Sequence, residues 1–163
     1  MSKKRIIACL VVRHGIVVQS IGFRRYLPVG RPEIAARFLN DWGVDEIILL
    51  DITAIAGGRA VDPEMVRRVA RGCYVPLAVG GGIRSIADMR AVLQAGADKI
   101  CVNSLAVENL SLLTEAAGVF GDQCLIASID VRCTAAGYEI FASGGSRPTG
   151  LAPAAYVRRL AKA

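Results

Sequence analysis

The sequence is poor in aromatic residues and in histidine, and it has no long hydrophobic run. Aromatic side chains make up 6% of the 163 residues, and His14 is the single histidine. No apolar stretch approaches the roughly 20 residues that a membrane-spanning helix needs. The basic run Lys3–Arg5 before Ile6–Val12 resembles a signal peptide, but Arg13 ends the apolar run early and no small-residue cleavage site follows. We therefore expect a cytoplasmic protein without membrane contact.

The five cysteines lie far apart, and neither a C-x-x-C pair nor a nearby histidine offers the spacing of a metal site. Three of them fall in apolar, strand-like runs, where cysteine packs as a small hydrophobic residue. We expect reduced thiols, no metal and no organic cofactor. The cysteines are Cys9, Cys73, Cys101, Cys124 and Cys133.

The net charge of +6 comes mainly from arginines that are spread along the chain, as at Arg67, Arg68, Arg158 and Arg159. A nucleic-acid interface usually has denser basic residues that alternate with aromatic ones. The pattern therefore favours a solvated surface, with some attraction for phosphorylated substrates, over a nucleic-acid interface.

Short aliphatic runs alternate with longer amphipathic segments, which is typical of βα units around a parallel sheet. The composition, 53% hydrophobic and 21% charged, fits such an α/β protein. The predicted strands are Arg5–Val12, Asp45–Ile52, Val75–Val79, Asp98–Asn103 and Cys124–Asp130. The predicted helices are Pro32–Trp42, Pro63–Arg71, Ile86–Gln94, Leu110–Phe120 and one that begins near Pro153.

Local signals support these boundaries. Asp62 followed by Pro63 and Glu64 predicts a capped helix start. Ser85 and Asp88 have the spacing of a capping box, and Val11–Val18 is expected to form a small hairpin.

An internal repeat indicates a barrel. Gly43–Asp51 and Gly96–Ser104 share the order of glycine, small apolar residue, aspartate, charged residue and strand. A doubly wound open sheet is the alternative, but no G-x-G-x-x-G follows the first strand. A complete (β/α)₈ barrel takes about 250 residues. We therefore expect residues 1–163 to form one incomplete barrel of the α/β class, truncated to about five βα units.

Polar residues stand where the strands end, and in a parallel barrel this edge carries the active site. Gly80–Gly82 could let backbone N–H groups approach an anion, with help from the following helix start. Asn103 and Ser104 add donors one unit later, so together they predict a phosphate site, with Asp51 as a further candidate for substrate binding. Asp130 is equally compatible with general acid or base catalysis and with capping of the following turn.

Charged residues open three of the strands, at the opposite edge. Arg5, Glu46 and Lys99 would lie at the bottom of the barrel, where bulky aliphatic side chains are expected. Ordinary surface salt bridges are one explanation. A gate or a docking feature across the barrel floor is the other.

Several motifs resemble the cyclase subunit of imidazole glycerol phosphate synthase, the HisF family, and the match is collinear over nearly the whole chain. The matching segments are Arg5–Leu10, Asp45–Thr53, Val79–Arg84, Gly96–Ile100, Val102–Ser104, Ala106–Asn109 and Ser128–Asp130.

The resemblance implies a lyase of histidine biosynthesis without a cofactor. A HisH-type glutaminase docks at the barrel floor, and its ammonia crosses the barrel to a bisphosphorylated aminoimidazole carboxamide nucleotide. By position, Asp130 corresponds to one of two catalytic aspartates. The ammonia gate would comprise Arg5, Glu46 and Lys99, and one phosphate site Gly82, Asn103 and Ser104.

Two positions depart from the family pattern. Val11 stands where the second catalytic aspartate is expected, and Gln19 stands where a lysine is expected. This combination is similar to HisF-like paralogues that form acetamidino groups on nucleotide-linked sugars for surface polysaccharides. Further alternatives are a HisA-type isomerase, against which the charged floor argues, and a non-catalytic barrel fragment. Because five strands cannot close a barrel, we expect negligible cyclase activity and self-association of this chain.

Overall fold

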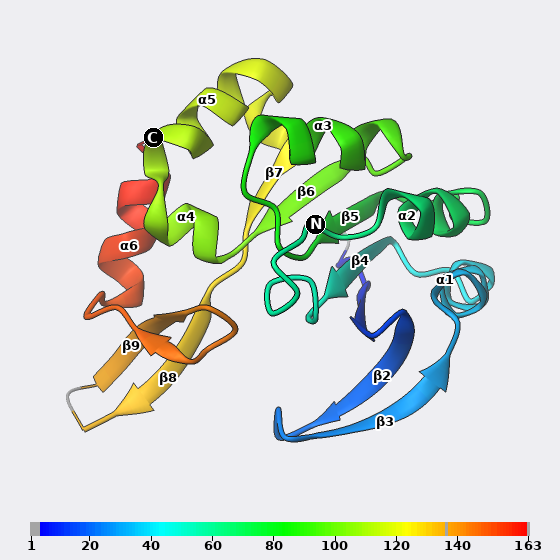
Figure 1. Cartoon of the computed structure of the whole chain (residues 1–163), viewed down its shortest axis with the longest axis horizontal. Helices are drawn as coiled ribbons and strands as arrows, with labels where there is room; N and C mark the ends of the chain where they lie inside the picture. Colours follow the sequence, from blue (N-terminus) through cyan, green and yellow to red (C-terminus); the bar gives the residue numbers. More distant parts are fainter. Residues whose placement is uncertain (1–3, 136, 163) are drawn as a thin grey trace. The chain divides into compact units, whose positions relative to one another are not determined.

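The structure is a computed structural model, and it describes residues 4–135 and 137–162. The chain forms two compact units, the first ending at Cys101 and the second beginning at Val102. Figure 1 shows the order of their helices and strands. Within the described residues, no helix combines the length and the hydropathy that crossing a membrane requires.

The first unit is built on parallel strands that run β1 (Ile7–Arg13), β4 (Glu46–Asp51), β5 (Leu77–Gly80) and β6 (Lys99–Val102) in spatial order. The predicted α/β class and these strands are confirmed, with ends that shift by one to two residues. Arg5 is an exception, because it precedes β1 instead of opening it. The described strands do not close into a barrel.

Helices connect these strands as predicted: α1 (Pro32–Asp41), α2 (Pro63–Ala70) and α3 (Ile86–Gln94). Asp62 caps α2, since its Oδ1 accepts the Glu64 N–H at 3.0 Å. Ser85 and Asp88 form the predicted capping box at the start of α3. Each cap satisfies backbone donors that the first helical turn leaves unpaired.

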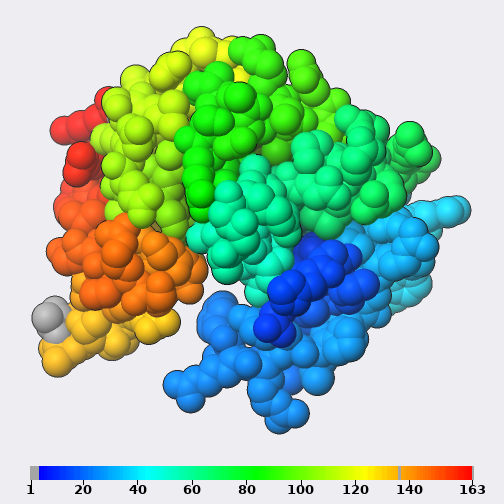
Figure 2. Space-filling view, viewed as in Figure 1, coloured from blue at the N-terminus to red at the C-terminus, as the bar shows by residue number. Residues whose placement is uncertain are grey.

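The predicted hairpin after the first strand is confirmed. β1 pairs antiparallel with β2 (Ile16–Ile21) across the two-residue turn of His14 and Gly15, whose φ angles are 51° and 78°. Such a turn needs positive φ at both central residues, which favours glycine at the second. β3 (Arg25–Gly30) extends this hairpin and was not predicted, and the two strands project from the rest of the first unit (Figures 1 and 2).

The core of the first unit lies between the sheet and the helices. Ile47, Leu49 and Leu77 are at most 1% exposed on the strands, and Val66 and Met89 are fully buried on α2 and α3. The alternate residues of β4 face the other side of the sheet, where burial is less complete. This pattern follows from the two-residue period of a strand.

The second unit contains α4 (Ser104–Glu108), α5 (Leu110–Phe120), a 3₁₀ turn (Asp122–Cys124), β7 (Leu125–Ala127) and α6 (Pro153–Leu160). The predicted helices α5 and α6 are confirmed. Within this unit, Ser128 N–H donates to Val102 O at 2.7 Å, just after β7 ends. The short helix α4 was not predicted.

A separate antiparallel sheet follows, in the order β10 (Arg147–Pro148), β9 (Gly137–Ala142), β8 (Asp130–Thr134). The predicted boundary of the fifth strand was wrong here: Asp130 does not end β7 but begins β8, where it pairs with Phe141. The chain leaves the first ladder at Ser128, and no glycine or proline marks this break in the sequence. β9 packs against α6 within this unit, as Figure 1 shows.

Candidate functional site

Asp51 ends β4 as a buried carboxylate whose two oxygens both have partners. Its side chain is 2% exposed. Oδ1 accepts the Thr53 N–H at 2.9 Å and the Thr53 hydroxyl at 2.7 Å, and Oδ2 lies 2.9 Å from Arg59 Nη1. Asp51 therefore orders the loop between β4 and α2, whereas its predicted contact with a substrate stays a prediction.

The glycine triplet after β5 is required by close packing. A Cβ atom at Gly80 would lie 2.6 Å from Cys101 O, and one at Gly81 would lie 2.6 Å from Asp51 O. At Gly82 it would lie 2.0 Å from Arg59 O, a distance that no side chain tolerates. Close packing therefore accounts for these glycines, and the phosphate contact of Gly82 remains a prediction.

The start of α3 offers fewer free donors than the sequence indicated. Asp88 Oδ2 accepts the backbone N–H groups of Arg84 at 3.0 Å and Ser85 at 3.1 Å. A carboxylate of the chain itself thus occupies these two donors beside the positive end of the helix.

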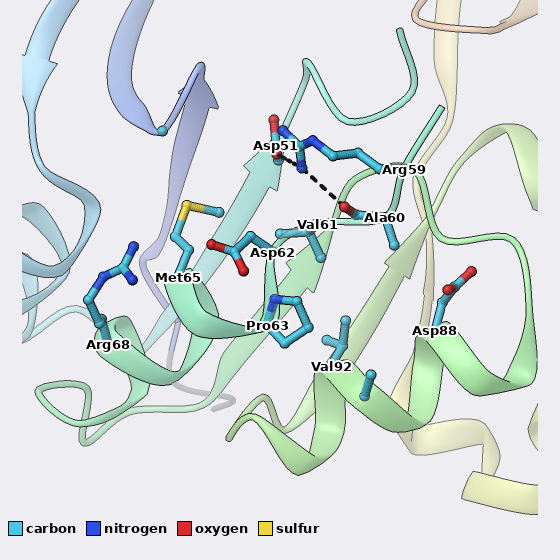
Figure 3. A pocket seen from close by; sticks show the side chains of 12 residues that line it. Asp51, Arg59, Ala60, Val61, Asp62, Pro63, Met65, Arg68, Asp88 and Val92 are labelled. Carbon is cyan, nitrogen blue, oxygen red and sulfur yellow. Dashed lines mark hydrogen bonds and ion pairs between the residues drawn. The ribbon is translucent and has the colours of Figure 1, made fainter. Parts of the chain in front are cut away.

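Arg59 was missed by sequence reasoning. Figure 3 shows it beside Asp51 at a cavity of about 640 Å³ in the first unit. Nη1 also donates to Ala60 O at 3.0 Å, and the side chain remains 47% exposed. The cavity walls come from the β4–α2 loop, α2 and α3, and they include Asp62, Met65 and Asp88. Gly82 is not among the lining residues.

At the opposite edge of the sheet, the structure brings two of the predicted floor residues together. Lys99 Nζ donates to Glu46 Oε1 at 2.8 Å, and the Glu46 side chain is only 3% exposed. β5 lies between the strands that carry them, so the pair spans one strand of the sheet. Arg5 is exposed, and the ion pairs found among the described residues do not include it.

In the second unit, a turn links the predicted phosphate residues to a later part of the chain. Ser104 Oγ accepts the Ser143 N–H at 2.9 Å. Asn103 Oδ1 is buried and has no hydrogen-bond partner within the described structure. A buried amide without a partner is costly and often marks a site that a ligand or water completes.

The same turn also approaches Asp130. Ser143, Gly144 and Gly145 have consecutive positive φ angles of 54°, 66° and 74°. A Cβ atom at Gly145 would lie 3.5 Å from Arg132 Nη2 and 3.9 Å from Asp130 Oδ2. The turn therefore connects Ser104 with Asp130, and neither the turn nor Arg132 was recognised in the sequence.

Val11 and Gln19, which depart from the family pattern, both lie within paired strands of the first sheet. Val11 is half-buried inside β1, opposite Leu50 of β4, and no carboxylate replaces it there. Gln19 is exposed on β2, opposite Leu27.

The cysteines are all free thiols. Burial raises the pKa values of the Cys9 and Cys73 thiols, which keeps them protonated and weakly nucleophilic near neutral pH. No cluster of metal-binding side chains occurs in residues 4–135 and 137–162.

Comparison with known proteins identifies close relatives. The chain is 43% identical over 163 residues to the "Imidazole glycerol phosphate synthase subunit HisF" of Alkaliphilus metalliredigens, covering 99% of this chain and 65% of the relative. It is 44% identical over 159 residues to the protein of that name from Streptococcus mutans, covering 97% and 63%. For Streptococcus sanguinis the identity is 46% over 151 residues, covering 92% and 60%.

The chain thus spans about 60–65% of the length of these relatives. The family model described as "Histidine biosynthesis protein" matches residues 5–163, which include every candidate site residue named above. The chain therefore belongs to the histidine biosynthesis protein family.

Proposed function

We propose that the protein acts as a HisF-type subunit of imidazole glycerol phosphate synthase, which takes ammonia from a glutaminase partner and adds it to a phosphorylated substrate. The relatives carry this name. The observation that carries the proposal is the Glu46–Lys99 pair at 2.8 Å. An isomerase or a simple phosphate-binding protein has no need of a charged pair at the edge where the strands begin.

The pair has the properties of a gate. Glu46 is buried and fixed on β4, whereas the Lys99 side chain is 27% exposed and sits on a flexible stem. Movement of the ammonium group would open a path, and its return would close the path against water. The glutaminase, of the HisH type, would bind at this edge, with exposed Arg5 as a third member of the gate.

The chemistry would take place at the other edge. Asn103 and Ser104 offer an amide and a hydroxyl to a phosphate, and Gly82 and Asp51 are further proposed contacts. Asp130 would act as the general acid or base. Its position at the start of β8 places its carboxylate near Gly145 of the turn whose Ser143 N–H binds Ser104 Oγ.

A binding experiment tests this function. The protein should bind both a HisH-type glutaminase and the bisphosphorylated aminoimidazole carboxamide nucleotide, as measured by calorimetric titration. Lys99→Met should reduce transfer of glutamine-derived ammonia while leaving the affinity for the nucleotide unchanged. Arg158→Gln, an exposed arginine on α6, is the control for net charge. Absence of both binding events would refute the proposed function.

The acetamidino-sugar paralogue is the second candidate, and Val11 favours it. Valine transfers no proton, so a cyclisation that uses two carboxylates has only Asp130 here. Amidine formation on a sugar would still need ammonia and therefore the same gate. Binding of the glutaminase without binding of the aminoimidazole nucleotide would support this second candidate.

Self-association is proposed through an apolar stripe on α1. Ile34, Phe38 and Trp42 recur at intervals of four residues and are 61%, 55% and 72% exposed. The Phe38 and Trp42 rings lie 4.6 Å apart. In an antiparallel two-fold pairing centred on Leu39, Arg37 of each copy lies opposite Asp41 of the other, so the charges beside the stripe complement a second copy of this chain.

Sedimentation velocity tests this interface. Phe38→Glu should yield monomers, whereas Phe23→Glu, which changes a more exposed ring on the β2–β3 hairpin, should leave the dimer intact. Arg37→Asp should weaken the dimer, and Arg37→Asp combined with Asp41→Arg should restore it. A monomeric wild-type protein would rule the interface out.

A further inference from the structure

The phosphate site predicted from the sequence contains no cation. Its members Gly82, Asn103 and Ser104 are all neutral, although a phosphate monoester carries between one and two negative charges near neutral pH. Neutral donors bind phosphate, but a guanidinium adds charge and two parallel hydrogen bonds. A cation close to Ser104 would therefore complete the site, and the second unit contains one.

Arg132 is held in place by an aromatic ring. Its guanidinium carbon lies 4.7 Å from the centre of the Phe141 ring, and the two residues belong to the paired strands β8 and β9. Stacking of this kind orients the planar guanidinium while its N–H groups at the edge stay able to donate. The side chain is exposed at the surface of the hairpin.

No ion pair among the described residues joins Arg132 to the acidic groups that face it. Glu139 is its cross-strand partner, but Glu139 Oε1 accepts the Gly150 N–H at 2.7 Å. Glu108 pairs with Arg147 at 2.6 Å. Asp130 precedes Arg132 on the same face of β8, and the ion pairs of the described residues do not join the two. The guanidinium thus keeps donors for a ligand.

The Ser143–Ser146 turn connects this cation to the phosphate residues. Ser143 N–H binds Ser104 Oγ at 2.9 Å, and Gly145 packs beside Arg132 Nη2. Two residues of chain span at most about 7 Å, so the two contacts are close along the turn. Because Ser104 Oγ accepts the Ser143 N–H, its own O–H is left to donate, and such a chain of hydrogen bonds strengthens the donor.

We propose that Arg132 is a substrate-positioning residue, which binds a phosphate monoester of the substrate together with Ser104 and holds it beside Asp130. This inference rests on the proposed function and deepens it, because it names the charged ligand of the phosphate and the turn that places it. Phe141 orients the guanidinium, and the glycines at positions 144 and 145 let the backbone approach it without a side chain in between.

The affinity of the bisphosphorylated aminoimidazole carboxamide nucleotide, measured by calorimetric titration, tests the assignment. Arg132→Gln should raise Kd by roughly 10- to 100-fold, the range expected for loss of a hydrogen bond to a charged group. Arg132→Lys keeps the charge but loses the planar fork, so a smaller rise is expected. Phe141→Leu should raise Kd by a few-fold, and Arg158→Gln should leave it unchanged.

Two outcomes would overturn the assignment of Arg132. One is wild-type affinity in Arg132→Gln. The other is an equal loss in Arg158→Gln, which would indicate a net-charge effect only. Thermal unfolding of each variant separates a loss of binding from a loss of hairpin stability. If Arg132 had a purely structural role, affinity would fall in proportion to Tm, and a variant with wild-type Tm would bind with wild-type affinity.

The proposed function can fail separately from this assignment. If the wild-type protein binds inorganic phosphate but not the nucleotide, the synthase function is refuted, and the same variants titrated with inorganic phosphate then decide whether Arg132 is an anion ligand. An unchanged affinity for phosphate in Arg132→Gln would refute it there too.

Discussion

Glu46 and Lys99, which lie 53 positions apart in the sequence, form a hydrogen-bonded ion pair across β5 with an Nζ to Oε1 distance of 2.8 Å. Burial of a carboxylate is costly unless a partner compensates for the lost hydration. Here the partner is partly solvated and the carboxylate is not. Lys99 therefore stabilises the buried Glu46 carboxylate, a charge that an all-aliphatic core would not contain.

Lys99→Met should lower the free energy of unfolding by about 3 kcal/mol, because it leaves a buried carboxylate unpaired. Glu46→Leu combined with Lys99→Met should recover most of that loss, since no buried charge remains. Urea denaturation of the two proteins and of wild type measures the difference. Equal destabilisation in the single and double variants would show that the pair does not govern stability.

Gly82→Ala should destabilise the protein far more than Gly58→Ala. The two glycines have nearly equal φ angles, 63° and 65°, so the conformational cost of a side chain is the same, about 1 kcal/mol. A Cβ atom at Gly82 would lie 2.0 Å from Arg59 O, whereas one at Gly58 would meet nothing within 4 Å. The excess loss measures the packing of the β5–α3 turn against the loop that carries Arg59.

Thermal and urea unfolding of both variants would give the difference between their losses of stability. We expect this difference to be more than about 2 kcal/mol, because forced overpacking of a close-packed interior usually costs about that much. Similar losses in the two variants would mean that the turn moves away from Arg59 at little cost. The glycine would then be free for another role, such as the predicted phosphate contact.

The local parts of this fold were predictable from the sequence. α3 begins and ends where the helical pattern and the Ser85 capping signal placed it, and the His14–Gly15 turn lies where a two-residue hairpin needs positive φ. The polar residues at the strand ends were also found. These features depend on residues that are only a few positions apart, so local sequence patterns predict them.

The candidate site was less predictable, because its geometry depends on contacts between distant residues. Ser104 and Ser143 are 39 positions apart. The break between β7 and β8 falls at Ser128 and Ile129, where neither glycine nor proline marks the end of a strand, so Asp130 was assigned to the wrong strand. Nothing in the sequence distinguishes Arg132 from other exposed arginines, because its contact with the Phe141 ring depends on the pairing of β8 and β9. Hydrophobic periodicity does not predict such contacts, because it indicates which residues are buried and not which distant residues lie next to each other.

Tyr156 should make the stability sensitive to alkaline pH. The residue is 4% exposed on α6 and its hydroxyl has no partner in the described structure, so burial raises the pKa of the phenol above its usual value near 10. A group whose pKa is raised by folding contributes stability that is complete below the unfolded pKa and is lost as the pH rises through the folded pKa. The loss therefore begins near pH 10 and continues above it.

Tyr156→Phe removes the titrating group and the unpaired hydroxyl together. At pH 7 we expect it to be neutral or stabilising by up to about 1 kcal/mol, because no hydrogen bond is lost. Between pH 9 and pH 11 its free energy of unfolding should fall less than that of wild type. Parallel curves over this range would show that the buried phenol does not ionise with unfolding.

Val11→Asp tests which chemistry the protein retains. In a full-length version of the barrel, the new aspartate should increase the ammonia-dependent turnover of the bisphosphorylated aminoimidazole carboxamide nucleotide if the sequence is that of a synthase that has lost one of its two catalytic carboxylates. Turnover is measured with ammonium salts in place of the glutaminase, so that the gate does not limit the rate. Val11→Asn has nearly the same shape without a transferable proton and should give no increase.

The position allows the change. Val11 is half-buried and lies opposite Leu50 on the less covered face of β1 and β4, so a carboxylate there keeps access to water, and we expect a stability loss of only about 1–2 kcal/mol. Increased turnover in Val11→Asp alone would assign the protein to the histidine pathway. No increase in either variant, with binding to the glutaminase retained, would favour ammonia chemistry on a sugar, for which a valine at this position is no defect.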